Sequence, residues 1–166
     1  MSYSAILEQI QSSAVYQQWK KNHADSFLSS ILIVITPQKK SFTFHFYDPS
    51  RDAISSFIPG DSEVRLAEED GAILKQPSTI LVPLHIEDIT LAEEEALTLS
   101  RDLMNKEYSS ERATSWMLVL HHSTSLQWQV TAFTSSLGIF TAALDAGTGE
   151  IINHHISDIT SFKKAQ

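Results

Sequence analysis

The chain contains no cysteine, which excludes disulfide bonds, thiolate metal sites and cysteine nucleophiles. It also contains no apolar run long enough to span a bilayer. Residues 1–15 have neither a basic start nor a long apolar stretch, so the sequence shows no signal peptide. As the chain stands, these features predict a cytoplasmic protein, or an extracytoplasmic one if a signal has been removed.

Positive charge is scarce. Twelve Lys and Arg residues stand against twenty Asp and Glu residues, which gives a formal net charge of −8. Phosphate-rich partners need a surplus of cations, so an unassisted nucleic-acid or anionic-membrane surface is excluded. Hydrophobic residues make up 42% and charged residues 19% of the 166 residues. This is the composition of a globular chain with one domain or two very small ones.

The first half of the chain predicts one helix followed by strands. Apolar residues recur every three or four positions from residue 4 to residue 22, which is typical of an amphipathic helix. Phe42, Phe44 and Phe46 alternate with polar residues and therefore share one face of a strand. The predicted strands are residues 27–35, 41–47, 53–58 and 63–66. The acidic stretch Glu68-Glu69-Asp70 is interpreted as a solvated surface.

The second half repeats this order. A polar connector is predicted over residues 67–78, and a strand over 79–86 whose Pro83 indicates a sheet edge. Thr90 and Glu93 have the spacing of a capping box at the start of a helix over residues 91–107. The remaining predicted strands are 114–121, 126–133, 138–144 and 150–156.

A shift of 86 positions aligns the two halves. It places Phe42 on Trp128 and Phe44 on Val130, and it also matches Leu32 with Leu118 and Ile58 with Leu144. We therefore predict an α+β fold made by tandem duplication, cystatin-like in general shape, in which each helix packs on an antiparallel sheet. The predicted organisation is an N-terminal unit over 1–66, a connector over 67–78 and a C-terminal unit over 79–166. One continuous sheet with both helices on the same side is the alternative.

The second half resembles the PepSY family over residues 80–156. The residues that carry the resemblance are Glu95-Ala96-Leu97, Trp128-Gln129-Val130 and the hairpin Leu144-Asp145-Ala146-Gly147-Thr148-Gly149-Glu150-Ile151-Ile152. The first half lacks a Thr-Gly-Glu turn, so it is expected to be a diverged copy. The resemblance implies a noncatalytic module associated with peptidase inhibition or extracytoplasmic interaction.

Histidine pairs are the strongest candidates for metal or acid–base chemistry. His121-His122 and His154-His155 offer one imidazole per strand face, and one from each pair could meet if their strands were neighbours. No third ligand is evident. Asp145 and the glycines after it fit a hairpin turn better than a calcium loop or an aspartic-protease motif. We therefore assign no catalytic, cofactor-binding or metal-binding residue.

The sequence favours a noncatalytic binding or interaction protein with a protein or peptide partner, inhibitor-like or regulatory. A small-ligand module with a pocket between helix and sheet is the first alternative. An enzyme using the four paired histidines is the second, and a homodimer is also considered. An exposed edge strand can accept another strand by main-chain hydrogen bonding. The strand over 150–156 is expected to be a less protected edge than the strand over 81–86.

Overall fold

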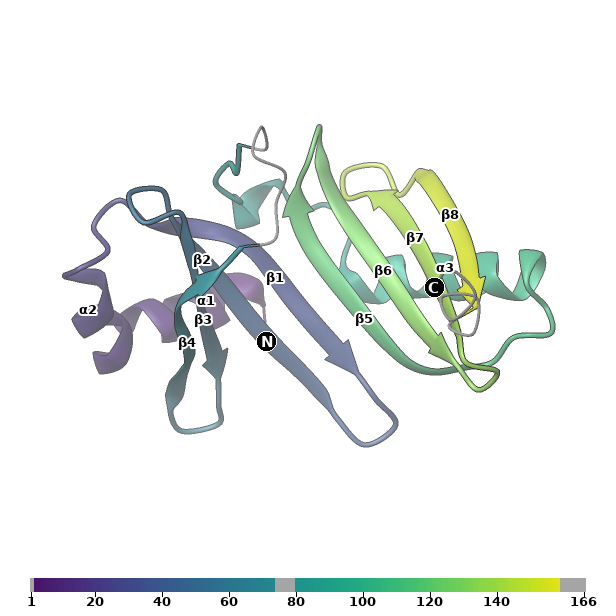
Figure 1. The fold of residues 1–166 in the computed structure, drawn as a ribbon, viewed down its shortest axis with the longest axis horizontal. Coiled ribbons are helices and arrows are strands. Elements are labelled where there is room, and N and C mark those ends of the chain that lie inside the picture. The colour runs from purple at the N-terminus through teal and green to yellow at the C-terminus, as the bar shows by residue number, and fades with distance from the viewer. Residues whose placement is uncertain (1, 74–79, 159–166) are drawn as a thin grey trace, which may run out of the picture. The chain divides into compact units, whose positions relative to one another are not determined.

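The fold is α+β, and it consists of two compact units. A computed structural model describes residues 2–73 and 80–158 (Figure 1). The first unit comprises residues 1–31 and 42–86, and the second comprises residues 32–41 and 87–166. No helix among the described residues has both the length and the apolarity needed to cross a membrane.

The first half of the chain contains two helices where the sequence predicts one. Its elements are α1 (Tyr3–Ser12), α2 (Ala14–Lys20), β1 (Phe27–Ile35), β2 (Lys40–Asp48), β3 (Ala53–Pro59) and β4 (Val64–Ala72), with the strand order β4-β3-β2-β1. Ser13 has extended backbone angles, φ −68° and ψ 146°, and interrupts the helix. Its hydroxyl accepts the Tyr16 N–H at 3.2 Å and so caps α2.

The second half has the predicted order of one helix and four strands. A short 3-10 helix, η1 (Ile86–Asp88), precedes α3 (Glu93–Glu107), β5 (Ala113–His122), β6 (Leu126–Thr134), β7 (Gly138–Asp145) and β8 (Ile151–Asp158). The strand order is β5-β6-β7-β8, and successive strands are antiparallel. Each half thus carries helical structure and a four-strand meander, which indicates duplication.

Two predictions around the connector are wrong. Residues 80–85 form no strand; the Leu84 N–H donates one hydrogen bond to the Leu28 carbonyl at 2.8 Å, and η1 follows. The strand β4 continues to Ala72, so the first part of the predicted connector is strand. Thr79 and residues 74–78 lie outside the described residues. Pro83 lacks a donor for a ladder, which is one reason why no strand forms there.

The predicted capping box is also wrong. The helix α3 begins after Ala92, whose N–H is bonded by Glu95 Oε2 at 3.2 Å. Thr90 instead donates its hydroxyl hydrogen to the carbonyls of Ala146 and Gly147, at 3.1 and 2.8 Å. The turn after β7 therefore engages the residue that was expected to cap the helix.

The predicted core faces are confirmed. Phe44 is fully buried, and the Phe46 ring lies 5.2 Å from the ring of Tyr16 in α2. In the second half, Trp128 is fully buried and its indole N–H donates to the Leu91 carbonyl at 2.9 Å, just before α3. In each half one sheet face therefore packs on the helices of that half, as Figure 1 shows for α3 behind β6 and β7.

The constant shift of 86 positions does not hold beyond one strand pair. Phe44 pairs with Phe57 across β2 and β3, whereas Val130 pairs with Ala142 across β6 and β7. The strand β6 thus follows β2 by 86 positions, but β7 follows β3 by 85. The turn between β6 and β7 is one residue shorter than the turn between β2 and β3. An alignment that shifts β3 by 86 positions therefore matches its inward-facing residues with outward-facing residues of β7.

The same error affects the first strand of each half. Ile31 and Ile33 are the fully buried positions of β1, whereas Leu32 is only half-buried. In β5 the fully buried positions are Leu118 and Leu120. Residues 31–35 are an unbroken run of aliphatic residues, so the sequence does not show which of them face inward, and the match of Leu32 with Leu118 was wrong.

The β6–β7 pair offers a matched test of the assigned core face. Phe140 is fully buried, whereas Phe133 on the opposite face is 38% exposed. Phe140→Ala should lower the free energy of unfolding by about 3–5 kcal/mol because it opens a cavity. Phe133→Ala should lower it by less than about 1 kcal/mol. Urea denaturation followed by tryptophan fluorescence measures both, and equal losses would contradict the assignment.

Candidate functional site

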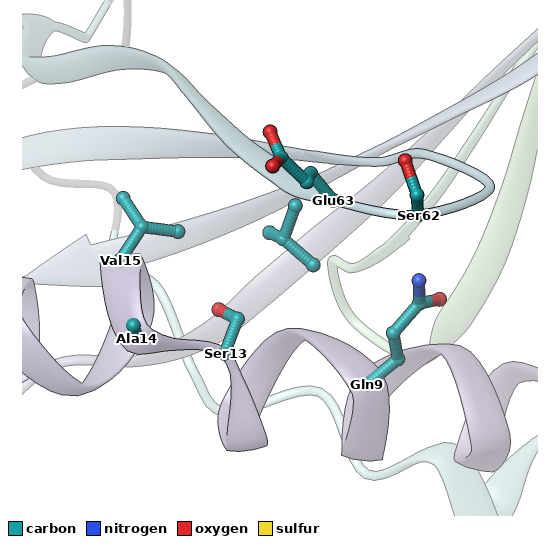
Figure 2. A pocket seen from close by; sticks show the side chains of 7 residues that line it. Gln9, Ser13, Ala14, Val15, Ser62 and Glu63 are labelled. Atoms are coloured by element: carbon teal, nitrogen blue, oxygen red, sulfur yellow. The ribbon is translucent and has the colours of Figure 1, made fainter.

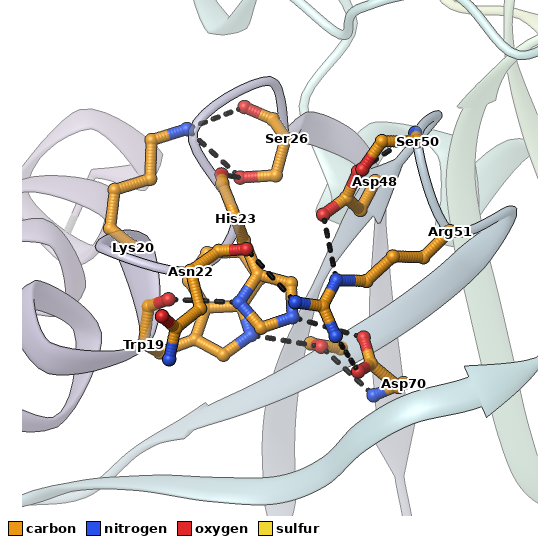
Figure 3. Close-up of polar contacts among 10 residues, drawn as sticks. Trp19, Lys20, Asn22, His23, Ser26, Asp48, Ser50, Arg51 and Asp70 are labelled. Atoms are coloured by element: carbon orange, nitrogen blue, oxygen red, sulfur yellow. Dashed lines mark hydrogen bonds and ion pairs between the residues drawn. The ribbon is translucent and has the colours of Figure 1, made fainter.

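A buried histidine organises the polar groups of the first unit. His23 follows α2, is 1% exposed, and stacks on the Trp19 indole with centroids 4.5 Å apart and an interplanar angle of 15° (Figure 3). Its Nδ1 lies 2.8 Å from the Trp19 carbonyl, and its Nε2 lies 3.0 Å from Asp70 Oδ1. A carbonyl oxygen only accepts hydrogen bonds, so the Nδ1 atom must carry a hydrogen. The other nitrogen faces a carboxylate, which makes the ring a bridge between α2 and β4.

Arg51 completes the contacts of the same carboxylate. Its guanidinium donates to Asp70 Oδ2 at 2.8 Å and to the Asn22 carbonyl at 3.1 Å. Asp70 has a φ of +51° and lies where the pairing of β3 with β4 shifts register. A left-handed Asp is an uncommon conformation that local bonds must hold. His23 and Arg51 supply those bonds, and Ser55 Oγ accepts the Asp70 N–H at 3.2 Å.

Asp48 is the most buried carboxylate of this cluster. It ends β2 and is 2% exposed; its Oδ1 accepts the Ser50 N–H at 2.9 Å and the Ser50 hydroxyl at 2.6 Å. Its Oδ2 has no hydrogen-bond partner among the described residues, and Arg51 Nε lies 3.6 Å away. Burial raises the pKa of Asp48, but the Ser50 hydrogen bonds and the charges of His23 and Arg51 outweigh it, so the pKa is lowered overall.

We call these four residues, His23, Asp48, Arg51 and Asp70, the polar latch. Both ring nitrogens of the histidine are engaged, and the hydroxyl of Ser55 accepts hydrogen bonds from the Trp19 indole and the Asp70 amide. The arrangement therefore fixes strand positions rather than activating a nucleophile, which would need a base directed at a free hydroxyl. Sequence reasoning missed the latch; its interpretation of Glu68-Glu69-Asp70 as a solvated surface agrees with the exposure of all three residues, but it did not foresee the bonds of Asp70 to His23 and Arg51. The available signal was the four-residue spacing of Trp19 and His23.

A shallow groove lies elsewhere in the first unit (Figure 2). It separates the α1–α2 junction from the β3–β4 hairpin, has a volume of about 450 Å³, and is lined by Gln9, Ser13, Val15 and Glu63 among others. Gln9 Nε2 donates to the Gly60 carbonyl at 2.9 Å and bridges the two walls. The Ser13 hydroxyl is already engaged with the Ile10 carbonyl at 2.6 Å.

The structure does not bring the two histidine pairs together. His121 and His122 lie on β5, and His154 and His155 lie on β8, with β6 and β7 between them. Three strand spacings correspond to about 14 Å, too far for a shared metal ion. His154 Nδ1 contacts the Tyr108 hydroxyl at 2.9 Å, and His155 contacts the Thr141 hydroxyl at 2.9 Å. Burial lowers the pKa of His121.

The turn interpretation of residues 145–149 is confirmed. Asp145 Oδ1 accepts the N–H groups of Gly147 and Thr148, both at 2.9 Å. Gly149 has a φ of +77°, and its N–H donates to the Asp145 carbonyl at 2.8 Å. Hydrogen bonds from the Thr148 N–H, the Ser125 hydroxyl and the Gly147 N–H lower the pKa of the Asp145 carboxyl. Both oxygens of this carboxylate thus accept hydrogen bonds, Oδ1 within the turn and Oδ2 from Ser125.

The outer edge of β8 is the remaining candidate. Among the described residues β8 pairs only with β7, and its side chains are mostly exposed from Ile151 to His155. Pairing is one-to-one from Asn153 to Asp158; a bulge at Ile152 precedes this stretch. Ile151 and Ile152 are 37% and 47% exposed. A regular edge with unpaired main-chain groups is a template for another strand.

Comparison with known proteins identifies the fold and no family. No family model matches the chain, and no curated protein matches it. A crystal structure from Clostridium difficile 630, of a protein described as a "putative lipoprotein", is similar with a TM-score of 0.51 and 12% sequence identity. The match covers 86% of this chain and 90% of that one. At this identity the likeness shows the α+β fold alone, and membership of the PepSY family stays a prediction.

The lowered pKa of Asp48 predicts a specific acid sensitivity. Its folded pKa lies below the ordinary value of 3.8, so its contribution to stability is present above that pH and is lost as the pH falls toward the folded pKa. Asp48→Asn should therefore be less stable than wild type at neutral pH, with a difference that shrinks below about pH 4. Urea denaturation across this range measures the difference. Asp61→Asn, an exposed control, should keep the wild-type profile; a pH-independent Asp48 difference would contradict the prediction.

Removing the hydrogen bonds of His23 should release β4. His23→Phe keeps a ring against Trp19 but removes one hydrogen bond from the Trp19 carbonyl and one from Asp70, which keep the Asn22 N–H and Arg51 as their remaining partners. We expect a loss of roughly 2–4 kcal/mol in unfolding free energy, because two hydrogen bonds are lost and one of them involves a carboxylate. The β4 amides should also exchange with deuterium faster. His122→Phe, an exposed control, should change stability by less than about 0.5 kcal/mol. Unchanged β4 exchange in His23→Phe would refute the role of the latch.

Proposed function

We propose that the chain is a noncatalytic binding protein that takes an extended segment of a protein or peptide as an added strand on the outer edge of β8. Among the described residues, the regular edge of this strand from Asn153 to Ser157 pairs with no strand other than β7, and this observation carries the proposal. Strand addition uses main-chain hydrogen bonds for affinity, and the outward-facing main-chain groups of this stretch are the ones it would use. The activity needs no nucleophile, cofactor or metal.

The contrast with β4 supports the choice of β8. Among the described residues β4 pairs only with β3, but it carries Glu68, Glu69 and Asp70 and contains two register shifts. Charge and bulges are two devices by which proteins protect sheet edges. The segment of β8 from Ile151 to Ser157 has no Lys, Arg, Asp, Glu or Pro. The edge of β4 thus carries both protective devices, whereas the stretch of β8 from Asn153 to Ser157 carries neither.

The exposed apolar residues point in the same direction. Ile151 and Ile152 are two of only five large hydrophobic side chains exposed among the described residues. An incoming strand would cover apolar surface beside them as it pairs, which adds a hydrophobic contribution to main-chain bonding. The PepSY-like hairpin leads directly into this strand, and the interaction role implied by that resemblance agrees with the proposal. The lipoprotein description of the C. difficile protein favours the extracytoplasmic alternative for location.

Hydrogen exchange tests strand addition without altering the protein. The probe is a synthetic peptide of about eight residues, a common strand length, with alternating Thr and Val and a lysine at each end. Saturating peptide should slow exchange at every second amide of Asn153–Asp158, because alternate N–H groups of an edge strand point outward. The measurement is amide exchange followed by NMR.

Two controls define the result. The same peptide with alternate peptide nitrogens methylated should give no protection, because it cannot complete the ladder. Amides of β4 should exchange at the same rate with and without peptide. Absence of protection in β8 with every probe peptide, whatever its end charges, would reject the proposed function.

A further inference from the structure

The charge of the second half restricts which strand can bind. Residues 87–166 carry eleven Asp and Glu against five Lys and Arg, two of which are Lys163 and Lys164. Glu150 immediately precedes β8 and Asp158 ends it, so a carboxylate lies at each end of the candidate edge. An acidic partner strand would be repelled at both ends, whereas a basic one would be attracted.

A small pocket is present at the Asp158 end of the edge. Its volume is about 260 Å³, and it is lined by Glu111, Ser136, Gly138, Ile156, Ser157 and Asp158. The Ser136 hydroxyl donates to Glu111 Oε2 and orients that carboxylate. Hydrogen bonds from Ser136 and Thr134 lower the pKa of Glu111, although the charge of Asp158 opposes them, so the group is ionised at neutral pH.

Gly138 keeps this pocket open. A Cβ atom at this position would lie 2.9 Å from Thr134 Oγ1 and 3.5 Å from both Glu111 Oε2 and the Ile156 methyl group. Any larger residue would therefore project among the groups that line the pocket. The space pairs an apolar wall from Ile156 with two carboxylates, which suits a long side chain that has an apolar stem and a cationic head.

We infer that the strand bound at β8 is cationic, with a Lys or Arg side chain at its Asp158 end that enters the pocket of Glu111 and Asp158, and a second basic residue near Glu150. This inference rests on the proposed function and names the chemistry of the partner. The main-chain ladder supplies sequence-independent affinity, and the carboxylates at its two ends select for charge. A carboxylate with a guanidinium or ammonium forms charge-assisted hydrogen bonds, which are stronger than neutral ones.

The same charges disfavour a second copy of the chain as the occupant. Two copies joined edge to edge through β8 would bring together surfaces that share an acidic surplus. Antiparallel self-pairing would also place histidines near histidines at the centre of the strand, without supplying a cation for Glu111. A basic heterologous segment would bring a cation to Glu111, which self-association does not.

The test compares peptides and protein variants by fluorescence anisotropy. The lysine-ended probe should bind more tightly than an otherwise identical glutamate-ended peptide. Its binding should weaken severalfold when salt rises from about 0.01 M to about 1 M, because screening shortens the reach of these charges from about 30 Å to about 3 Å. Glu111→Gln, Asp158→Asn and Glu150→Gln should each weaken it by roughly two- to fivefold at low salt. Asp102→Asn, an exposed carboxylate on α3, is the matched control and should bind as wild type does.

The outcomes separate the inference from the proposed function. Equal binding and equal β8 protection by the two peptides would overturn the inference and leave strand addition intact. Unchanged affinity in all three edge variants would do the same. Loss of folding in Glu111→Gln would show as faster exchange throughout β7, in which case Glu150→Gln at the other end decides the question. Concentration-dependent protection of β8 without peptide would identify a second copy as the occupant and overturn the inference.

Discussion

A strand in an antiparallel sheet directs main-chain hydrogen-bonding groups to both sides, but the last strand of a meander has a neighbouring strand on one side only. This constraint governs both halves of the chain. The first half meets it by making β4 unsuitable for pairing, with two register shifts, three successive acidic residues and a left-handed Asp70. In the second half, the described residues leave β8 regular and uncharged from Asn153 to Ser157. Two copies of one architecture therefore differ most at the position where a sheet meets its surroundings.

The protection of β4 has a structural requirement, which the polar latch meets. A strand that is exposed along most of its length buries little apolar surface, so side-chain bonds must hold it to the helices. Asp70 receives two such bonds from His23 and Arg51, and the burial of Asp48 places a second carboxylate beside Arg51. The members share partners, so removing one changes the hydrogen bonds of the others, which is why such clusters respond strongly to single substitutions.

Periodicity was sufficient to predict most of the fold. The alternation of Phe42, Phe44 and Phe46 and the turn at Asp145 are local patterns, and local patterns carried the prediction of all eight strands, two core faces and a hairpin. The failures are not local. Ser13 is a polar residue of the kind found on helix surfaces, yet it caps a new helix. Thr90 donates a hydrogen bond to a turn more than fifty residues away. The latch joins residues 23, 48, 51 and 70, whose proximity depends on the register of β4, and no sequence pattern contains that register. The sequence could predict β8 as an edge strand because the residues that form it are consecutive and their pattern is local.

The break at Ser13 also divides the first helical segment mechanically. Helical order spreads along continuous backbone hydrogen bonds, and each interruption requires a new nucleus. α1 and α2 therefore gain and lose their helical structure as separate units, each with its own cap. Fraying that starts at Tyr3 ends at Ser13 and does not reach Trp19, which holds the ring of His23 from the last turn of α2. The short second helix thus insulates the latch from disturbance at the beginning of the first.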